Sequence, residues 1–376
     1  MAQIKFDVVN IGGGVMGASI ALELSKKGLN AAVIDRDEPG RHASYKAGGM
    51  LGAQNEFEQD CDLFRLAKAS RNRFKPLQQY LYDTTGIDIQ YRETGLIKMA
   101  RTAEENGRIT RQFNFLNGHD KGVRMLDSRE ILDLGNRLIL PNDLSAMHIP
   151  NDGQVNANKY THALTHVSKS NGVTHLRNTE VNAIKHTGHG YELNTSKGKV
   201  SAEKVIVTAG AWSDDLLKEF DIQSGITGVK GEVMLLENQK IHLDQTLFMT
   251  NGLYIIPKLD HRFLVGATSH FDDFSTGMTD EGEEWLWKEA TRRIPKLAES
   301  KVLMKSSGIR PYTQDEKPVM DELSDGLFLV GGHYRNGILL SPIVGELMSE
   351  WVVRGEWPQI LEDFSIERMM NHGMYY

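Results

Sequence analysis

The segment DVVNIGGGVMGASIALELSKKG, from Asp7 to Gly28, decides the fold. It begins within an apolar run, Phe6 to Ile11, that is typical of a buried strand and is interrupted by the glycines that follow. From Val15 to Lys27 apolar residues recur at helical spacing, and a second apolar run covers Ala31 to Ile34. The sequence therefore predicts a strand–helix–strand unit near its start.

Three glycines of this unit, Gly12, Gly14 and Gly17, form the pattern G-x-G-x-x-G at the junction of strand and helix. The first permits a tight turn, the second lets the backbone approach a pyrophosphate, and the third lets helix and strand pack closely. Asp35 ends the second strand, where a carboxylate binds ribose hydroxyls and disfavours the 2′-phosphate of NADP. The residues leave NAD and FAD open, and a plain glycine-rich turn with a solvated Asp35 is the competing interpretation.

The composition is that of an ordinary globular protein, with 376 residues, 40% of them hydrophobic, and a formal net charge of −7. Basic residues are nowhere concentrated, so a nucleic-acid partner is not expected. Cys61 is the only cysteine, which excludes an internal disulfide and a cysteine-built metal cage. No metal site is expected from the histidines either. No targeting segment or membrane-spanning run is evident, and we expect a soluble, cytoplasmic protein.

Along the chain the pattern changes from α/β to β-rich and back to α/β. Helices are predicted over Cys61–Tyr82, Asn158–Ser170, Thr279–Arg293 and Ile343–Val353, and strands over 92–99, 204–208, 229–236, 253–268 and 326–330. This order favours a nucleotide-binding domain interrupted by a β-rich, antiparallel substrate domain. We expect residues 1–85, 150–225 and 305–376 to form the first domain, and residues 86–149 and 226–304 to form the second.

Four separated segments of the chain resemble the D-amino-acid oxidase family of flavoproteins. They are Asp7–Gly28 with Asp35, AGGMLGA at Ala47–Ala53, VIVTAGAWS at Val205–Ser213, and GHYRNGILLSP at Gly332–Pro342. Shorter matches lie in LYIIP, VGAT and GIRP, so the resemblance covers essentially the whole chain, and it is closest to the bacterial glycine oxidases of thiamine biosynthesis. The resemblance implies an α/β (α+β) fold with a Rossmann-like FAD-binding domain.

The resemblance also implies FAD as the cofactor. Some relatives attach FAD to a cysteine in the last third of the chain, and because no cysteine follows Cys61 we expect non-covalent FAD here. His42 lies in a loop where some flavoproteins link FAD through histidine, but a solvated or capping histidine is the favoured interpretation. The expected cofactor-binding residues are Gly12, Gly14, Val15, Met16, Gly17, Asp35, Arg36, Ala43, Ser44, Gly48, Gly49, Met50, Val181, Gly210, His333, Tyr334, Arg335, Asn336, Gly337, Ile338 and Leu339.

Oxidation of an amino acid at a flavin requires a clamp for the carboxylate, and the guanidinium fork of arginine matches a carboxylate bidentately. By resemblance Arg310, in Gly-Ile-Arg-Pro, is that clamp, Tyr254 adds a second contact, and Arg335 lies near flavin and substrate. These three are the expected catalytic residues, and Met50 and Ala53 are expected to wall the substrate pocket. The competing interpretations are a surface arginine on a turn for Arg310 and a core tyrosine for Tyr254.

The expected function is FAD-dependent oxidation of glycine, sarcosine and small D-amino acids, with reoxidation by O2 to hydrogen peroxide. The resemblance further implies a supply of imine for the thiazole of thiamine, and a homo-oligomer, specifically a tetramer. A dehydrogenase of the same fold that passes electrons to a quinone or carrier would fit the same residues. An NAD-dependent dehydrogenase, in which GHYRNG has no role, and a non-catalytic flavin-binding protein also stay open.

Overall fold

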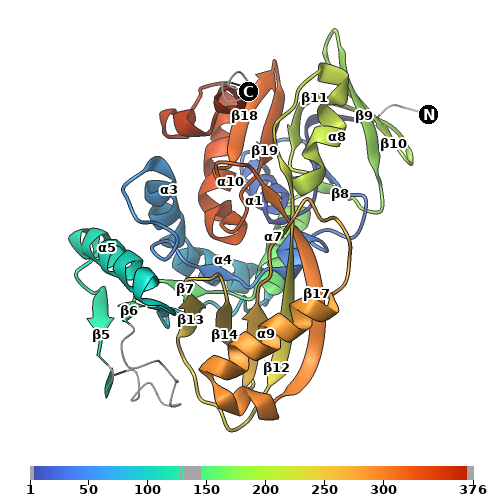
Figure 1. The fold of residues 1–376 in the computed structure, drawn as a ribbon. Coiled ribbons are helices and arrows are strands. Elements are labelled where there is room, and N and C mark those ends of the chain that lie inside the picture. The colour runs from blue at the N-terminus through green and yellow to red at the C-terminus, as the bar shows by residue number, and fades with distance from the viewer. Residues whose placement is uncertain (1–3, 128, 131–144, 371–376) are drawn as a thin grey trace.

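The computed structural model describes residues 4–127, 129–130 and 145–370, which form a nucleotide-binding-type sheet and a second, largely antiparallel sheet (Figure 1). The first sheet is centred on β1 (Ile4–Ile11), which runs parallel to β2 (Ala31–Ile34) on one side and β11 (Gly198–Val207) on the other. These parallel neighbours confirm the strand–helix–strand prediction and the α/β class.

Strands from three distant parts of the chain complete this first sheet. β8 (Thr174–Leu176) lies parallel to β2, and β19 (Leu327–Gly331) lies parallel to β11. The antiparallel members are β18 (Val319–Ser324) beside β19, and the hairpin of β9 (Val181–Thr187) and β10 (Gly190–Thr195) beside β11.

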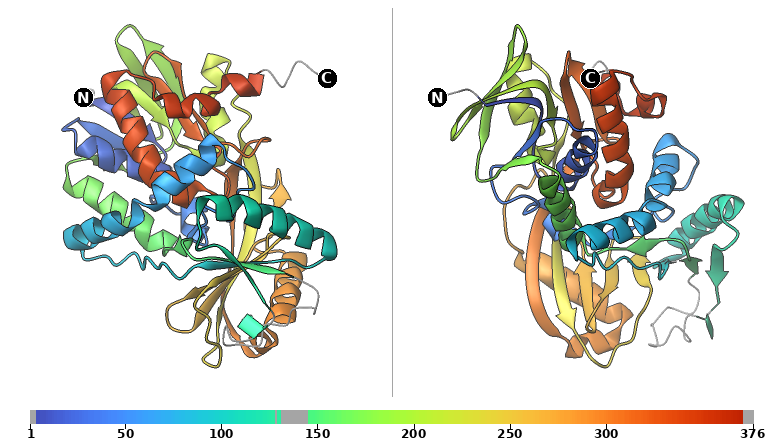
Figure 2. Two further views of the ribbon diagram at one scale, coloured as in Figure 1. Left: turned by 90° about the vertical axis from the view of Figure 1, so that its left-hand side faces the viewer. Right: turned by 180° about the vertical axis from the view of Figure 1, so that it is seen from behind.

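Three helices pack around the first sheet: α1 (Val15–Ser25), α7 (Ala157–Ser170) and α10 (Gly337–Arg354), with α1 in contact with both others (Figure 2). α1 and α10 pack closely because Gly345 has no side chain, and a Cβ there would stand 3.0 Å from the carbonyl oxygen of Ser19. The hydroxyl of Ser19 also donates to the carbonyl of Ser341, at 2.7 Å. This packing ties the C-terminal part of the chain to its first helix.

The second sheet has the order β16–β12–β15–β14–β13–β4–β6–β5, with β17 paired to β12. Its strand pairs are antiparallel except for β13 and β4. Helix α9 (Asp280–Arg293) covers one face of this sheet (Figure 1), and its Trp285 and Trp287 pack against the core there. The strands are β4 (Leu96–Met99), β5 (Arg124–Leu126), β6 (Ala146–Ile149), β12 (Thr227–Glu237), β13 (Thr246–Met249), β14 (Tyr254–Lys258), β15 (Arg262–Gly266), β16 (His270–Phe271) and β17 (Lys301–Tyr312).

Short elements join the two sheets. β3 (Met50–Leu51) pairs with β7 (Gly153–Gln154) in a small ribbon between them. The remaining elements are α2 (Ala43–Lys46), α3 (Asp62–Arg71), α4 (Phe74–Thr85), α5 (Ala103–His119), α8 (Ser213–Leu217), α11 (Glu367–Met370) and the 3₁₀ turns Gly210–Trp212, Lys218–Phe220, Pro295–Glu299 and Gln359–Phe364. In the described part of the chain, no helix is long and apolar enough to cross a bilayer.

Two helix predictions were wrong in extent. The helix expected over Cys61–Tyr82 is broken into α3 and α4, because Pro76 has no amide for the carbonyl four residues earlier and is tolerated only in the first turn of a helix. The last long helix begins at Gly337 rather than Ile343, so it contains Pro342. The carbonyl of Ile338, which Pro342 leaves without its helical partner, accepts a bond from the hydroxyl of Ser341 at 2.9 Å.

Candidate functional site

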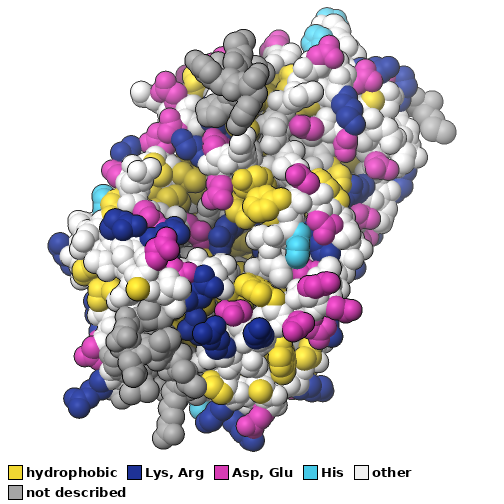
Figure 3. All heavy atoms as spheres, viewed as in Figure 1, with side chains coloured by type: hydrophobic (Ala, Val, Ile, Leu, Met, Phe, Trp, Pro, Cys, Tyr) yellow, Lys and Arg dark blue, Asp and Glu magenta, His cyan; other side chains and the backbone are white. Residues whose placement is uncertain are grey.

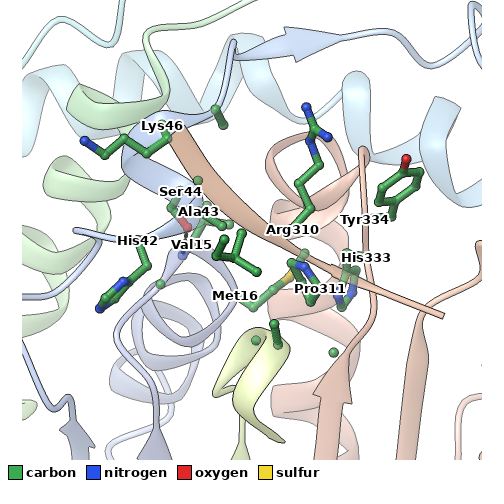
Figure 4. A pocket seen from close by; sticks show the side chains of 18 of the residues that line it. Val15, Met16, His42, Ala43, Ser44, Lys46, Arg310, Pro311, His333 and Tyr334 are labelled. Carbon is green, nitrogen blue, oxygen red and sulfur yellow. Dashed lines mark hydrogen bonds between the residues drawn. The ribbon is translucent and has the colours of Figure 1, made fainter. Parts of the chain in front are cut away.

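A cavity of about 500 Å³ lies between the two sheets and is lined by residues of both. The molecule is hollowed near the middle of the face drawn in Figure 3, with hydrophobic and basic side chains around the hollow. Figure 4 shows Val15 and Met16 on one side of the pocket and Arg310, Pro311 and Tyr334 on the side of β17.

The glycine pattern forms one end of this cavity. Gly12 has a φ of +111°, and a Cβ there would stand 2.4 Å from the carbonyl oxygen of Thr208. A Cβ on Gly17 would stand 1.9 Å from the carbonyl oxygen of Gly12, so this glycine serves helix–strand packing and does not line the cavity. The amide of Val15, at the start of α1, donates to the hydroxyl of Ser44 at 2.9 Å (Figure 4). This is the geometry that the fingerprint predicts for a pyrophosphate-binding turn.

Asp35 lies at the same end of the cavity, at the end of β2, and is nearly buried. Its carboxylate accepts from the amide of Gly13 at 2.7 Å and from the amide of Asp37 at 2.9 Å. Burial raises the pKa of Asp35 above its ordinary value, and the two amide bonds oppose that shift. The group is therefore fixed in orientation at the place where the sequence predicts a ribose contact.

His42 is exposed, as expected for a solvated histidine, and it occupies the N-cap position of α2 without a side-chain capping bond, while it also lines the cavity. Its Nε2 lies 2.7 Å from a carboxylate oxygen of Asp37, and its ring lies 5.4 Å from that of Trp212, measured between centroids. The guanidinium of Arg36 stacks over the same indole at 4.1 Å. Trp212, in the segment VIVTAGAWS, thus closes this end of the cavity, although the sequence analysis did not single it out.

The segment Gly48–Met50 forms a second wall. Gly49 has a φ of +78°, and a Cβ there would stand 2.1 Å from the carbonyl oxygen of Val155. A Cβ on Gly48 would stand 2.7 Å from the side chain of Ile256. A side chain at Gly49 would collide with backbone, and one at Gly48 would require Ile256 to shift, so these glycines let the wall follow the cavity closely.

Arg310 lies on β17, paired with Val229 of β12, and its guanidinium extends over Gly231, where a Cβ would stand 2.2 Å from Nη2. Its Nη1 donates to the carbonyl of Thr268 at 3.2 Å, and its guanidinium lies 6.0 Å from the ring of Tyr334. Within residues 4–127, 129–130 and 145–370 it forms no ion pair with a carboxylate. Arg310 therefore offers the cavity a positive charge with neutral neighbours.

Tyr254, on β14, is buried against glycine backbone on both sides. A Cβ on Gly266 would stand 2.5 Å from its hydroxyl oxygen, and one on Gly48 would stand 3.5 Å from its ring. Burial raises the pKa of the Tyr254 phenol, while the charges of Arg310 and Arg335 oppose that shift. The phenol is thus protonated at neutral pH and can donate a hydrogen bond into the cavity.

Arg335 differs from Arg310 in having an acidic partner. Its Nε lies 3.7 Å from a carboxylate oxygen of Glu56, and that charge raises the pKa of Arg335. Its guanidinium also lies 5.3 Å from the ring of Phe248. The positive charge of Arg335 is therefore partly offset, whereas that of Arg310 is not.

His333 is buried in the cavity wall beside these groups. Its Nε2 has no hydrogen-bond partner among the described residues, and burial lowers the pKa of His333 to about 3. A buried, neutral and unsatisfied imidazole of this kind fits a wall that a polar ligand covers. The unpartnered His333 and the close glycine backbone at Gly12, Gly48 and Gly49 show that the residues lining the cavity fit a bound FAD.

Most residues expected from the sequence do line the cavity, but four do not. Ala53 is fully buried behind the wall, since β3 ends at Leu51, and Gly17, Asn336 and Leu339 also lie outside the lining. Lining residues that lie outside the sequence motifs include Lys46, Thr179, Thr250, Asn251 and Ser269, and Thr208 and Trp212 line the cavity from within the segment VIVTAGAWS. In the described part of the chain, no cluster of histidine, cysteine or acidic residues could hold a metal ion.

Comparisons with known proteins agree on one family. The sequence model of the family described as "FAD dependent oxidoreductase" matches residues 7–351. The glycine oxidase of Geobacillus kaustophilus (strain HTA426) is 38% identical, over 97% of each chain, and that of Bacillus subtilis (strain 168) is 31% identical, over 96% of this chain and 97% of that protein. The crystal structure of glycine oxidase from Geobacillus kaustophilus matches with a TM-score of 0.94 over 97% of this chain and 99% of that chain.

A further relative, named bifunctional protein ThiO/ThiG, comes from Synechocystis sp. (strain ATCC 27184 / PCC 6803 / Kazusa). It is 30% identical over 98% of this chain, which spans 55% of that protein's length.

Proposed function

This chain belongs to the FAD dependent oxidoreductase family, and from that premise we propose that it oxidises glycine, sarcosine and small D-amino acids. The chain is an FAD-dependent oxidase of amines or amino acids, so an NAD-dependent dehydrogenase is set aside. The observation that carries the proposal is Arg310, whose charge faces the cavity without an acidic partner in the described part of the chain, beside the protonated phenol of Tyr254.

We assign FAD to the cavity as follows. The turn at Gly12–Val15 and Ser44 would hold the pyrophosphate, Asp35 the ribose, and Gly48–Met50 with His333–Gly337 the ring system. FAD, when bound, supplies the acceptor for a hydride. The protein's own contribution is to bind and orient the amino acid and to exclude water.

In this proposal Arg310 binds the substrate carboxylate bidentately and the hydroxyl of Tyr254 donates to the same group. Arg335, held by Glu56, borders the reaction space. With the amine neutral, its Cα–H bond breaks, the hydrogen leaves with both electrons, and the nitrogen lone pair forms the C=N bond. The imine then reacts with water to give the oxo acid and ammonia, and O2 takes up two electrons and two protons as hydrogen peroxide.

The glycine oxidases at 31% and 38% identity support glycine as a substrate. The bifunctional relative supports a link to thiamine biosynthesis, in which the imine is used directly. The predicted domain boundaries and a homo-oligomer remain part of this proposal.

Replacement of Arg310 by alanine tests the proposal directly. Loss of a charge-assisted bidentate contact, worth about 1.5–3 kcal/mol, should raise KM for glycine at least about tenfold. FAD should stay bound, as shown by the visible spectrum of the purified variant. A matched control is Arg262→Ala, which removes an exposed arginine from β15. Unchanged KM in Arg310→Ala would refute the clamp, and loss of FAD from that variant would make Arg310 structural and Arg335 the favoured clamp.

A further inference from the structure

Lys258 ends β14, four residues after Tyr254, and its ammonium group lies behind the cavity wall. Nζ donates to the carbonyl of Gly48 at 2.8 Å, to Oε1 of Gln154 at 2.9 Å and to the carbonyl of Val155 at 3.2 Å. Three acceptors match the three N–H groups of a charged lysine, and a neutral amine would leave one acceptor without a donor.

These acceptors fix the wall formed by Gly48–Met50. The carbonyl of Val155 is the atom that a Cβ on Gly49 would strike, and the amide of Val155 donates to the carbonyl of Gly49 at 2.8 Å. Met50 pairs with Gln154 in the β3–β7 ribbon. Lys258 therefore fastens the ribbon and the glycine wall to the second sheet at one point.

The charge of Lys258 is also unusual in its surroundings. All three of its hydrogen-bond partners are neutral, and within residues 4–127, 129–130 and 145–370 it forms no ion pair with a carboxylate. By contrast, two other inward lysines have acidic neighbours: Glu56 and Glu58 for Lys98, and Glu232 for Lys230.

A positive charge without a counter-charge lowers the energy of negative charge that develops nearby, and a low-dielectric interior strengthens this effect. A flavin gains negative charge when it accepts a hydride. Burial lowers the pKa of Lys258 to about 7, and the charge of Arg92 acts in the same direction. No anion of the described residues holds the proton on Lys258, so negative charge in the cavity would favour the charged lysine.

We propose that Lys258 is a positioning residue that holds the Gly48–Met50 wall and, through its unpaired positive charge, raises the reduction potential of the bound flavin. The inference rests on the placement of FAD in the cavity given above, and it is independent of which amino acid is the substrate.

Three substitutions in the FAD-loaded enzyme separate charge from hydrogen bonding. Lys258→Arg keeps the positive charge and the hydrogen-bond donors, and Lys258→Gln keeps donors but loses the charge. Lys258→Met keeps the length of the side chain and loses both the charge and the donors. FAD affinity is measured by fluorescence titration of the apoprotein, and the midpoint potential by reduction with a reference dye. No amino acid is present in either measurement, so a wrong substrate assignment leaves both results unaffected.

We expect Lys258→Gln and Lys258→Met to lower the potential by about 30 mV, a tenfold change in the two-electron equilibrium constant. Lys258→Arg should stay near the wild-type potential, and Lys258→Met alone should also bind FAD about tenfold more weakly. A wild-type potential in Lys258→Gln would overturn the role of the charge, as would equal losses in Lys258→Gln and Lys258→Arg. If Lys258→Met fails to fold, the other two variants still decide the question.

Discussion

Arg310 and Arg335 reach the same cavity with different electrostatic partners, and this difference supports the separate roles proposed for them. Glu56 offsets the charge of Arg335, while the groups around Arg310 are neutral, among them the carbonyl of Thr268 and the hydroxyl of Ser269. Sequence motifs identified both arginines, since GIRP and GHYRNG are short and local. They could not show that Glu56, far away in the sequence, would neutralise one of them.

At the same scale, Tyr254→Phe should weaken substrate binding less than Arg310→Ala does. The substitution removes one hydroxyl, worth about 1 kcal/mol, and leaves the ring packed on Gly48 and Gly266. KM for glycine should rise about fivefold with kcat nearly unchanged. Because burial raises the pKa of the phenol, the ratio of the KM of Tyr254→Phe to that of the wild type should be constant from about pH 6 to 9 in steady-state assays. A ratio that collapses toward one at the alkaline end would contradict a protonated Tyr254.

Among the secondary-structure elements, the glycine fingerprint and the first strand–helix–strand unit were fully predictable. The spacing of apolar residues and the glycines that form the turn are both local features of the sequence. The start of α10 was not predictable, since a proline in a helical pattern normally marks a boundary. Tertiary contacts override that rule here: Ser341 satisfies the carbonyl of Ile338 and also contacts the phenol of Tyr160 at 2.9 Å. Ala53 was expected to wall the pocket but is buried behind it. The turn after β3 decides which side chains face the cavity, and the sequence motif does not reveal that turn.

Ser341→Ala should therefore destabilise the protein. It leaves the fully buried phenol of Tyr160 and the carbonyl of Ile338 without a partner, at a cost of about 1–3 kcal/mol. Chemical denaturation of the apoprotein measures the change. In the background of Tyr160→Phe, which removes the phenol, Ser341→Ala should cost clearly less. Strictly additive effects would show that the two side chains do not depend on each other.

On the scale of the whole molecule, the cavity is assembled from both sheets, and this explains which site residues the sequence missed. Thr250 and Ser269 belong to no motif, and Trp212 was not singled out within VIVTAGAWS. These residues reach the cavity because β13, β15 and β11 end beside it. The two-sheet organisation itself was predictable, because the hydrophobic period changes along the chain. The placement of one sheet against the other depends on long-range packing, and it could not be predicted from the sequence.

A prediction at this scale concerns the link between protein and cofactor. Cys61, the only cysteine of the sequence, lies at the start of α3 and does not line the cavity. We expect FAD to be held without a covalent bond, so acid precipitation of the yellow holoenzyme should release the colour into the supernatant. Absorbance spectra of the supernatant and of the redissolved pellet show where the flavin is. Flavin retained in the pellet would contradict the prediction of non-covalent FAD.

The first sheet contains β1 and β2 from the start of the chain, β8 and β11 from its middle, and β18 and β19 from its end. During synthesis on the ribosome, this sheet therefore stays incomplete until β19, which ends at Gly331, has emerged. Nascent chains that stop before residue 327 lack the strand that covers β11 and the helix that packs on α1. A fragment that stops there therefore exposes one edge of β11, which is a site for aggregation or chaperone binding, and we expect it not to bind FAD.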